Sequence, residues 1–235
     1  MIAINNLHKS FGKLKVLEGV NIDALDKGIF AVLGPNGSGK TTLIKSILGM
    51  VIPDSGSIRF NNQEIIGQWQ YRDQLSYMPQ IANFPPNLKV KELIKMIKEM
   101  RGGETSEQAL IALFSLESAL EKNFSNLSGG TKQKVNILLT FMFDSPLIIL
   151  DEPTTGLDPL ALVNLKELIR NEREKGKTII ITSHIMSFVD ELSDRIVFLL
   201  EGHIHFNGTV GELKEQTGKS NLELAIAQLL KETNA

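Results

Sequence analysis

The sequence predicts an α/β fold in which a mainly parallel sheet is covered by helices. From residue 147 onwards, expected strands at 147–150, 178–182 and 195–200 alternate with expected helices at 160–174 and 185–192. Such alternation is typical of parallel strands joined by helical crossovers. A strand, a glycine-rich loop and a helix also follow one another directly over residues 29–50. These two observations define the fold class.

The remaining segments add two smaller parts to this core. Short strands are expected at 2–7, 16–25 and 57–60, and a closing strand at 202–208. Residues 85–143 are mainly helical, with expected helices at 90–100, 106–114 and 128–143, and they form a small lobe inserted in the larger domain. Helices at 210–215 and 222–231 end the chain. We therefore expect one domain over 1–235, with a helical lobe at about 85–143 and a helical extension at about 209–235.

The amino-acid composition indicates which kinds of partner the chain could bind. Lys plus Arg number 25 and Asp plus Glu number 27, which gives a net charge of −2. This balance argues against a nucleic acid partner, because phosphate neutralisation needs a basic surface. The chain has no cysteine, which fits a reducing, cytoplasmic compartment. The most apolar runs, 135–143 and 147–150, fall short of the roughly 20 residues that cross a bilayer. Any membrane role is therefore expected to depend on a partner.

Residues 34–41 match the template G-x-x-x-x-G-K-[ST] between an expected strand and an expected helix, the context that a phosphate-binding loop requires. Glycines let successive N–H groups converge on phosphate oxygens, and the following helix directs its positive end at the same anion. Lys40 would contact the β- and γ-phosphates of ATP, and the Thr41 hydroxyl would ligate Mg²⁺. These flanks disfavour a purely structural glycine turn. The nucleotide-binding residues expected here are Gly34, Pro35, Asn36, Gly37, Ser38, Gly39, Lys40, Thr41 and Thr42.

Two adjacent carboxylates follow the apolar segment 147–150. Asp151 and Glu152 would lie at the carboxyl end of a buried strand, where ligands bind in open α/β sheets. Asp151 would hold Mg²⁺, and Glu152 would orient and deprotonate the attacking water. Taken alone, an acidic turn closing a strand would explain the pair as well. Together with the phosphate loop, the pair indicates a nucleotide hydrolase.

A third motif, Leu-Ser-Gly-Gly-Thr-Lys-Gln-Lys at 127–134, opens an expected helix ahead of the acidic pair. It resembles the signature of the ATP-binding cassette (ABC) family, usually written L-S-G-G-Q. The three motifs occur in the family's order, and the resemblance covers residues from about 2 to 208. It implies a phosphate-loop (RecA-like) nucleotide-binding core with an antiparallel β subdomain and an inserted α-helical subdomain.

The resemblance implies five further roles. Phe11 would stack on adenine with Val16 near the ribose, and Gln80 would contact Mg²⁺ and link the two lobes. Asp158 matches the loop aspartate that crosses to a second subunit, and His184 matches the histidine that contacts the γ-phosphate. Four of these residues also have a structural alternative: Phe11 in the core, Gln80 in a turn, Asp158 as the N-cap ahead of a proline, and His184 as a helix cap.

The signature motif predicts a second subunit. Ser128, Gly129 and Gly130 can offer a hydroxyl, two N–H groups and a helix dipole to a γ-phosphate. The phosphate loop of the same chain already encloses one side of the nucleotide. The resemblance therefore implies that the signature contacts ATP bound by an opposite copy, in a head-to-tail homodimer. Thr131 replaces the usual Gln, which affects coupling at this helix and the turnover rate more than ATP use. Lys134 replaces the more usual Arg, a mild change, although the two residues are not interchangeable at a bidentate site.

The resemblance predicts an ATP-hydrolysing transporter subunit that binds a separate transmembrane permease at the cytoplasmic face of the membrane. The short extension after Gly208 favours exporter-type subunits, similar to those for drugs, sodium or copper-site maturation. The apolar loop 81–86 after Gln80 would help form the groove for the permease, unless Phe84 packs within the helical lobe. A different class stays open: a soluble ATPase of the same family that assists iron–sulfur cluster assembly or protein remodelling.

Overall fold

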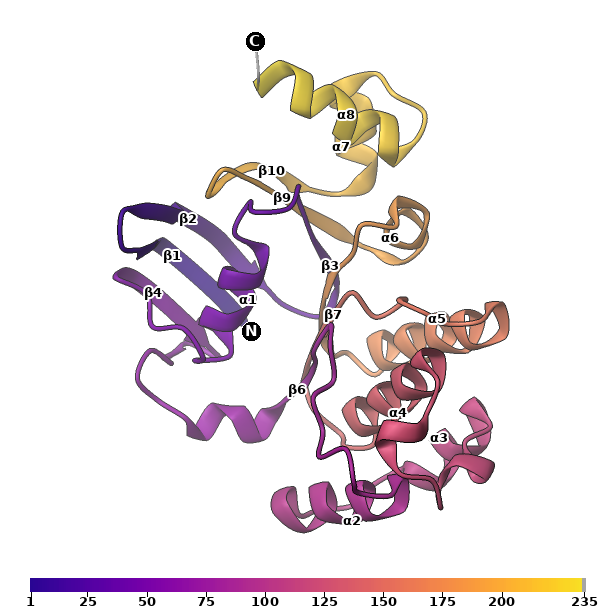
Figure 1. Ribbon diagram of the computed structural model, residues 1–235. Coiled ribbons are helices and arrows are strands. Elements are labelled where there is room, and N and C mark those ends of the chain that lie inside the picture. The colour runs from indigo at the N-terminus through magenta and orange to yellow at the C-terminus, as the bar shows by residue number, and fades with distance from the viewer. Residues whose placement is uncertain (234–235) are drawn as a thin grey trace.

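Two sheets organise the chain in the computed structural model, which describes residues 1–233 (Figure 1). The smaller sheet is antiparallel, with the strand order β2-β1-β4-β5. Its strands are β1 (Ile2–Phe11), β2 (Leu14–Leu25), β4 (Ser55–Phe60) and β5 (Gln63–Glu64). The β1–β2 hairpin extends to Phe11 and Leu14, which pair directly, so both strands are longer than the sequence pattern predicted.

The larger sheet has the order β10-β9-β3-β8-β7-β6 and is parallel except for β10 at its edge. Its strands are β3 (Gly28–Leu33), β6 (Leu75–Met78), β7 (Leu147–Asp151), β8 (Thr178–Thr182), β9 (Arg195–Leu200) and β10 (His203–Gly208). Every residue of β3, β7 and β8 is buried, as expected for parallel strands covered on both faces. Parallel strands end at one edge of the sheet, so the loops that follow β3, β6, β7 and β8 lie near one another.

The helices fall into three groups (Figure 1). Three of them, α2 (Val90–Arg101), α3 (Glu107–Phe114) and α4 (Gly129–Phe141), lie together below the larger sheet in the view shown. The helices α1 (Lys40–Ile47), α5 (Pro159–Glu174) and α6 (Met186–Leu192) pack on the sheets. At the other end lie α7 (Val210–Thr217) and α8 (Leu222–Thr233). The last residues of the expected C-terminal extension, Asn234 and Ala235, lie outside the described residues.

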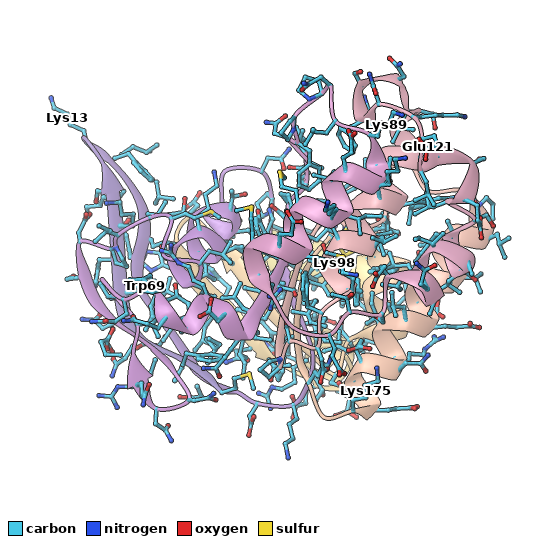
Figure 2. The ribbon with its side chains drawn as sticks, turned by 90° about the horizontal axis from the view of Figure 1, so that it is seen from below. Lys13, Trp69, Lys89, Lys98, Glu121 and Lys175 are labelled. Carbon is cyan, nitrogen blue, oxygen red and sulfur yellow. The ribbon has the colours of Figure 1, made fainter. Side chains whose placement is uncertain are left out.

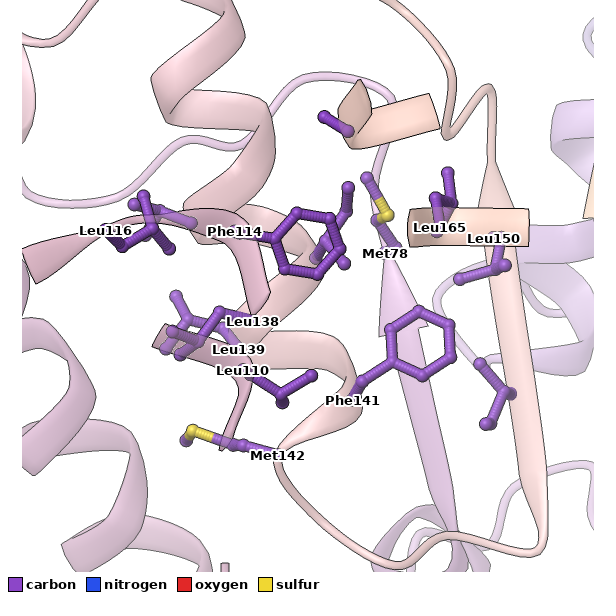
Figure 3. Close-up of a cluster of buried hydrophobic side chains, with 14 of the residues drawn as sticks. Met78, Leu110, Phe114, Leu116, Leu138, Leu139, Phe141, Met142, Leu150 and Leu165 are labelled. Atoms are coloured by element: carbon purple, nitrogen blue, oxygen red, sulfur yellow. The ribbon is translucent and has the colours of Figure 1, made fainter. Parts of the chain in front are cut away.

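A shared apolar cluster joins the three lobe helices to the larger sheet (Figure 3). Phe114 of α3 and Phe141 of α4 pack in the same cluster as Met78 of β6, Leu150 of β7 and Leu165 of α5. All of these side chains are buried. Truncating a buried phenylalanine to alanine typically costs about 3–5 kcal/mol, so this cluster fixes the lobe on the core.

Polar contacts add to this attachment. Arg101, at the end of α2, donates from Nη1 to Ser76 Oγ over 3.0 Å and from Nη2 to Ser145 Oγ over 2.6 Å. Its guanidinium also lies 4.5 Å from the ring centre of Phe143. At the start of α2, Lys89 pairs with Glu121 over 3.1 Å on the surface (Figure 2).

The turn between β9 and β10 connects the two sheets. The backbone N–H of Gly202 donates to the carbonyl of Ser38 over 3.2 Å, and its carbonyl accepts from the N–H of Glu18 over 3.0 Å. Gly202 has a φ of 79° and lies against the carbonyl of Val16, so a side chain there would be strained and would clash. The phosphate loop is thereby tied to the end of the larger sheet and to β2.

The structure differs from the expected elements at a few ends. Strand β6 was not predicted; it is only four residues long. Helix α1 begins at Lys40 and ends at Ile47, because the chain turns at Leu48. Helix α4 begins at Gly129, with Ser128 as its N-cap. Among the helices within residues 1–233, none has the length and apolarity that crossing a bilayer requires.

Candidate active site

The loop between β3 and α1 has the backbone of an anion-binding site. Gly37 and Gly39 have φ angles of 83° and 105°, which glycine adopts without strain, and Gly39 is the N-cap of α1. Lys40 Nζ donates to the carbonyls of Gly34 over 2.7 Å and Pro35 over 2.9 Å, so the ammonium lies across the loop. The N–H groups of the first turn of α1 are directed into the same space.

The loop is closely packed, and one of its buried hydroxyls has no partner. The hydroxyl of Ser38 is buried and finds no hydrogen-bond partner among the described residues. A Cβ added to Gly34 would lie 2.0 Å from the carbonyl oxygen of Leu199, so the loop packs directly on the backbone of β9. A buried hydroxyl without a partner costs free energy unless a ligand or water satisfies it. The loop is therefore built to hold a polar ligand.

A cavity of about 320 Å³ lies over this loop. It brings together Phe11, Val16, residues of the phosphate loop, Gln80 and both acidic residues. Its lining residues are Phe11, Leu14, Val16, Asn36, Gly37, Gly39, Lys40, Thr41, Thr42, Gln80, Asp151, Glu152 and Thr182. Phe11 is 52% exposed, so it is not a core residue, and Lys9 Nζ lies 5.3 Å from its ring centre. Leu14 was not predicted; it adjoins Phe11 because the two residues pair across the hairpin.

Three oxygen donors in this cavity suit Mg²⁺. Thr41, Gln80 and Asp151 contribute a hydroxyl, an amide oxygen and a carboxylate, the hard ligands that this ion prefers. Asp151 ends β7 opposite Thr182 of β8, and the Thr182 hydroxyl donates to Asp151 Oδ1 over 2.5 Å. This bond orients the carboxylate. Thr182 was missed because the strand pairing that places it is invisible in the sequence.

Glu152 has an unusual backbone. Its φ of 50° lies in the left-handed region, which is uncommon for a residue with a Cβ and is found at functional sites. Its N–H donates to the carbonyl of Thr182 over 3.1 Å. The carboxylate is 12% exposed, and Nδ1 of the largely exposed His184 lies 2.8 Å from its Oε2. The strained turn thus places a shielded carboxylate between His184 and the cavity.

Charge and burial act in opposite directions on Lys40. Burial lowers the pKa of Lys40, and the negative charges of Glu152 and Asp151 oppose that change. The ammonium and the two carboxylates therefore influence one another across the cavity. An anion bound in the phosphate loop would lie beside the Lys40 ammonium, because this ammonium lies across the loop.

The signature residues do not meet this cavity. Of the described residues that line it, none belongs to Ser128–Gly130. Ser128 caps α4 by accepting a bond from the N–H of Thr131 over 3.2 Å, and the two hydroxyls lie 2.8 Å apart. Thr131 thus bonds the very hydroxyl that the signature would offer to a phosphate. The sequence flagged Thr131 as unusual but did not reveal this contact.

Within one chain, Asp158 acts as a helix cap. Its Oδ1 accepts from the N–H of Ala161 over 2.9 Å, and Pro159 occupies the first turn of α5. Its Oδ2 lies 2.6 Å from Lys134 Nζ, and this ammonium, with the capping bond, holds the pKa of Asp158 below its usual range. The structural alternative is therefore realised, and contact with a second subunit stays a prediction.

The loop after β6 is anchored on one side and open on the other. Asn136 Nδ2 donates to the carbonyl of Pro79 over 3.0 Å, which holds the loop next to Gln80. Phe84 packs edge-to-face on Phe124, with ring centres 5.4 Å apart, so it belongs to the helical lobe. Ile81 is 73% exposed.

These features define a phosphate-loop ATPase: the loop, the acidic pair and the polar strand ends surround one cavity at the edge of a parallel sheet. The family model described as ABC transporter matches residues 17–155, more than half of the chain. The chain therefore belongs to the ABC transporter family. As such it is an ATP-binding transporter subunit that hydrolyses ATP to ADP and phosphate.

Individual relatives agree with this assignment. The chain is 37% identical to the lantibiotic transport ATP-binding protein SrtF of Streptococcus pyogenes, over 95% of this chain and 94% of the relative. It is 34% identical to the Nod factor export ATP-binding protein I of Burkholderia lata, over 86% and 68% respectively. A solved structure of an ATP-binding subunit of an ABC transporter superposes with a TM-score of 0.91 at 30% identity, covering 98% of this chain and 99% of that one.

Proposed function

We propose that this chain powers an exporter, as one of two identical cassettes bound to a separate permease at the cytoplasmic face of the membrane. The observation that supports the dimer is that the signature residues do not line the cavity. Ser128, Gly129 and Gly130 are absent from the described lining of that cavity, and Ser128 begins a helix whose N-terminal dipole favours an anion. A head-to-tail second copy would bring this helix to the open side of the bound ATP.

Export is supported by the relatives. The matched Burkholderia protein is named for Nod factor export and the Streptococcus protein for lantibiotic transport. The proposed unit is one nucleotide-binding domain over residues 1–235, with its helical lobe at about 85–143 and the extension at about 209–235. The exposed Ile81, next to Gln80, makes the loop after β6 the candidate surface for the permease.

Each site residue is proposed to have the following role. The backbone of residues 34–39 and Lys40 bind the phosphates, Thr42 lies in the first turn of α1, and Phe11 and Val16 face the base and ribose. Thr41, Gln80 and Asp151 would hold Mg²⁺, which neutralises phosphate charge when bound. Glu152 orients the attacking water and accepts its proton, while His184 holds the carboxylate in place through Nδ1. Asp158 is proposed to contact the opposite copy.

Glu152→Gln tests this proposal. The amide cannot accept the proton, so we expect ATP hydrolysis to fall by at least about a hundredfold while ATP binding persists. Unable to cleave its ATP, the variant should form a dimer in size-exclusion chromatography with light scattering, in the presence of ATP and Mg²⁺ and not of ADP. Glu167→Gln, at an exposed position of α5, is the matched control and should behave as the native chain. Full turnover by Glu152→Gln would show that another group is the base.

A further inference from the structure

One face of α4 holds the loop that leads from Glu152 to Asp158. Three residues of the helix, Gly130, Gln133 and Lys134, are spaced i, i+3 and i+4, so they lie on one side of α4. Each contacts a different part of the loop. Together they run along it from the residues beside Glu152 to the cap of α5.

The first contact is between two backbones. A Cβ added to Gly130 would lie 2.7 Å from the carbonyl oxygen of Gly156, closer than real Cβ atoms come to other atoms. Gly156 itself has a φ of 75°, a conformation that suits glycine. The first turn of α4 and the middle of the loop therefore touch with no side chain between them.

The second contact reaches the chain beside the base. Gln133 is buried, and its Nε2 donates to the carbonyl of Pro153 over 3.0 Å and, more weakly, to that of Glu152 over 3.5 Å. These carbonyls belong to the two peptide bonds on either side of Pro153, directly after the strained Glu152 backbone. Gln133 therefore constrains the backbone from which the Glu152 side chain projects.

The third contact closes the far end of the loop. Lys134 Nζ lies 2.6 Å from Asp158 Oδ2, while Oδ1 of the same carboxylate caps α5. The two oxygens thus bind different elements, α4 and α5. The Lys134 side chain is 21% exposed and that of Asp158 is 50% exposed, so solvent screens the pair in part.

From these contacts we infer that Gln133 and Lys134 are positioning residues, which fix the general base of their own chain to the helix whose N-terminus reads the ATP of the opposite copy. The inference rests on the dimer proposed above. The phosphate loop and Lys40 lie outside this set of contacts, so the positioning acts on hydrolysis and not on ATP binding. A shift of α4 on meeting the opposite nucleotide therefore moves Glu152 of the same chain, and the two ATP sites respond to each other.

Steady-state kinetics test the two residues. Lys134→Met removes the charge and keeps the stem, and Gln133→Leu removes the donor at similar volume. We expect kcat to fall about tenfold in each, with KM for ATP unchanged within about twofold. Lys134→Arg restores a cation at Asp158 and should recover most of kcat. A kcat within twofold of native for both variants, at native melting temperature, would overturn the inference. So would Lys134→Met activity that falls only in proportion to lost folded protein.

A double-mutant cycle isolates the ion pair. Asp158→Asn keeps an oxygen to cap α5 but loses the charge that Lys134 binds. If the two side chains act through each other, adding Lys134→Met to Asp158→Asn lowers kcat no further. Additive losses would mean that Lys134 acts elsewhere.

Mixed dimers decide whether the positioning acts within one chain. A Lys134→Met chain is paired with a Glu152→Gln chain, so that the only working base belongs to the chain with the broken contact. In the control dimer, one chain carries both Lys134→Met and Glu152→Gln, and the other chain is native. Relative to native paired with Glu152→Gln, we expect about a tenfold loss in the first dimer and little loss in the second. The reverse pattern would place the effect at the opposite site and overturn the inference.

The results that would contradict the proposed function differ from those that would contradict the positioning roles. A native chain that binds ATP but neither hydrolyses it nor dimerises with Glu152→Gln contradicts the proposed function itself. If the native chain hydrolyses ATP and Glu152→Gln dimerises, but Gln133→Leu and Lys134→Met have native kcat, only the positioning roles are contradicted.

Discussion

Nδ1 of His184 lies 2.8 Å from Oε2 of Glu152, and the backbone N–H of His184 donates to the same oxygen over 3.4 Å. One residue thus contacts the proposed base twice, from its ring and from its main chain. The imidazole is largely exposed, so its Nε2 is available to a group entering from outside the chain. The base and its neighbour form one unit that spans the boundary between the cavity and the surface.

Replacing His184 should therefore affect the chemical step. In His184→Ala the backbone bond remains and the ring bond is lost, so we expect kcat to fall about 10- to 100-fold with little change in the Kd for ATP. Phosphate release and fluorescent-nucleotide titration measure the two quantities. His205→Ala, at an exposed position of β10, is the control. Loss of ATP affinity equal to the loss of kcat would contradict this role.

The phosphate loop offers a matched pair of glycines for stability. In Gly34→Ala the Cβ would collide with a backbone carbonyl at a φ of 150°, so we expect the free energy of unfolding to drop by about 3 kcal/mol or more. In Gly37→Ala, nothing lies within 4 Å of the added Cβ, and only left-handed strain remains, about 1–2 kcal/mol. Urea unfolding without nucleotide compares them. Equal losses would mean that the close approach to Leu199 relaxes freely.

Arg101 should contribute more to stability than a surface arginine. Arg101→Met removes the donors that bond two buried serines and the contact over Phe143, so we expect a loss of about 2–3 kcal/mol. Arg170 pairs with Glu191 on the exposed side of α5, and Arg170→Met should cost less than about 1 kcal/mol. Chemical denaturation of both variants measures the difference. A smaller effect for Arg101 than for Arg170 would contradict the buried role.

Phe11 should matter for nucleotide and not for folding. Because its ring is half exposed beside the cavity, Phe11→Ala should raise the Kd for ATP several-fold and leave the melting temperature nearly unchanged. Phe11→Trp should retain affinity. Trp69→Ala removes another exposed ring that is absent from the cavity lining, and its Kd should match the native chain. A destabilised Phe11→Ala with native affinity would make Phe11 a structural residue.

Ile81 tests docking of the proposed permease better than Phe84 does. Phe84 packs on Phe124, so Phe84→Asp would damage the lobe as well as any interface. Ile81→Asp places a charge on an exposed side chain, and we expect loss of copurification with the permease at unchanged ATP hydrolysis by the free chain. Leu224→Asp, at an exposed apolar position of α8, should leave assembly intact. Retained assembly of Ile81→Asp would rule out this surface.

The fold could be predicted where local signals were strong. The apolar segments that became β3, β7 and β8 are bounded by turns, and β7 and β8 lie between helices, so pattern alone placed them. Strand β6 escaped because Leu75–Met78 is too short to display a period, and it forms only because β7 offers a parallel partner. The phosphate loop and the acidic pair were found because each motif is contiguous in the chain.

Contacts between distant segments could not be predicted in this way. Thr182 orients Asp151 through strand register, and Leu14 joins the cavity through a hairpin. The bonds of Gln133 to Pro153 and of Lys134 to Asp158 need α4 to pack against a loop that follows in the chain, with 20 positions between Gln133 and Pro153. The sequence named Lys134 as a departure from the usual Arg, but only the fold supplied its partner.

The hydrogen bond between Gly202 and Ser38 joins residues that are synthesised at very different times. Ser38 leaves the ribosome early, whereas Gly202, which donates to its carbonyl, follows more than half a chain later. Likewise, β3 is synthesised before β8 and β9, the strands that pair with it on either side. A nascent chain therefore carries the phosphate motif for most of its synthesis without the supports that shape it. We therefore expect tight ATP binding only from the nearly finished polypeptide, so ATP would stabilise the last steps of folding and not the first.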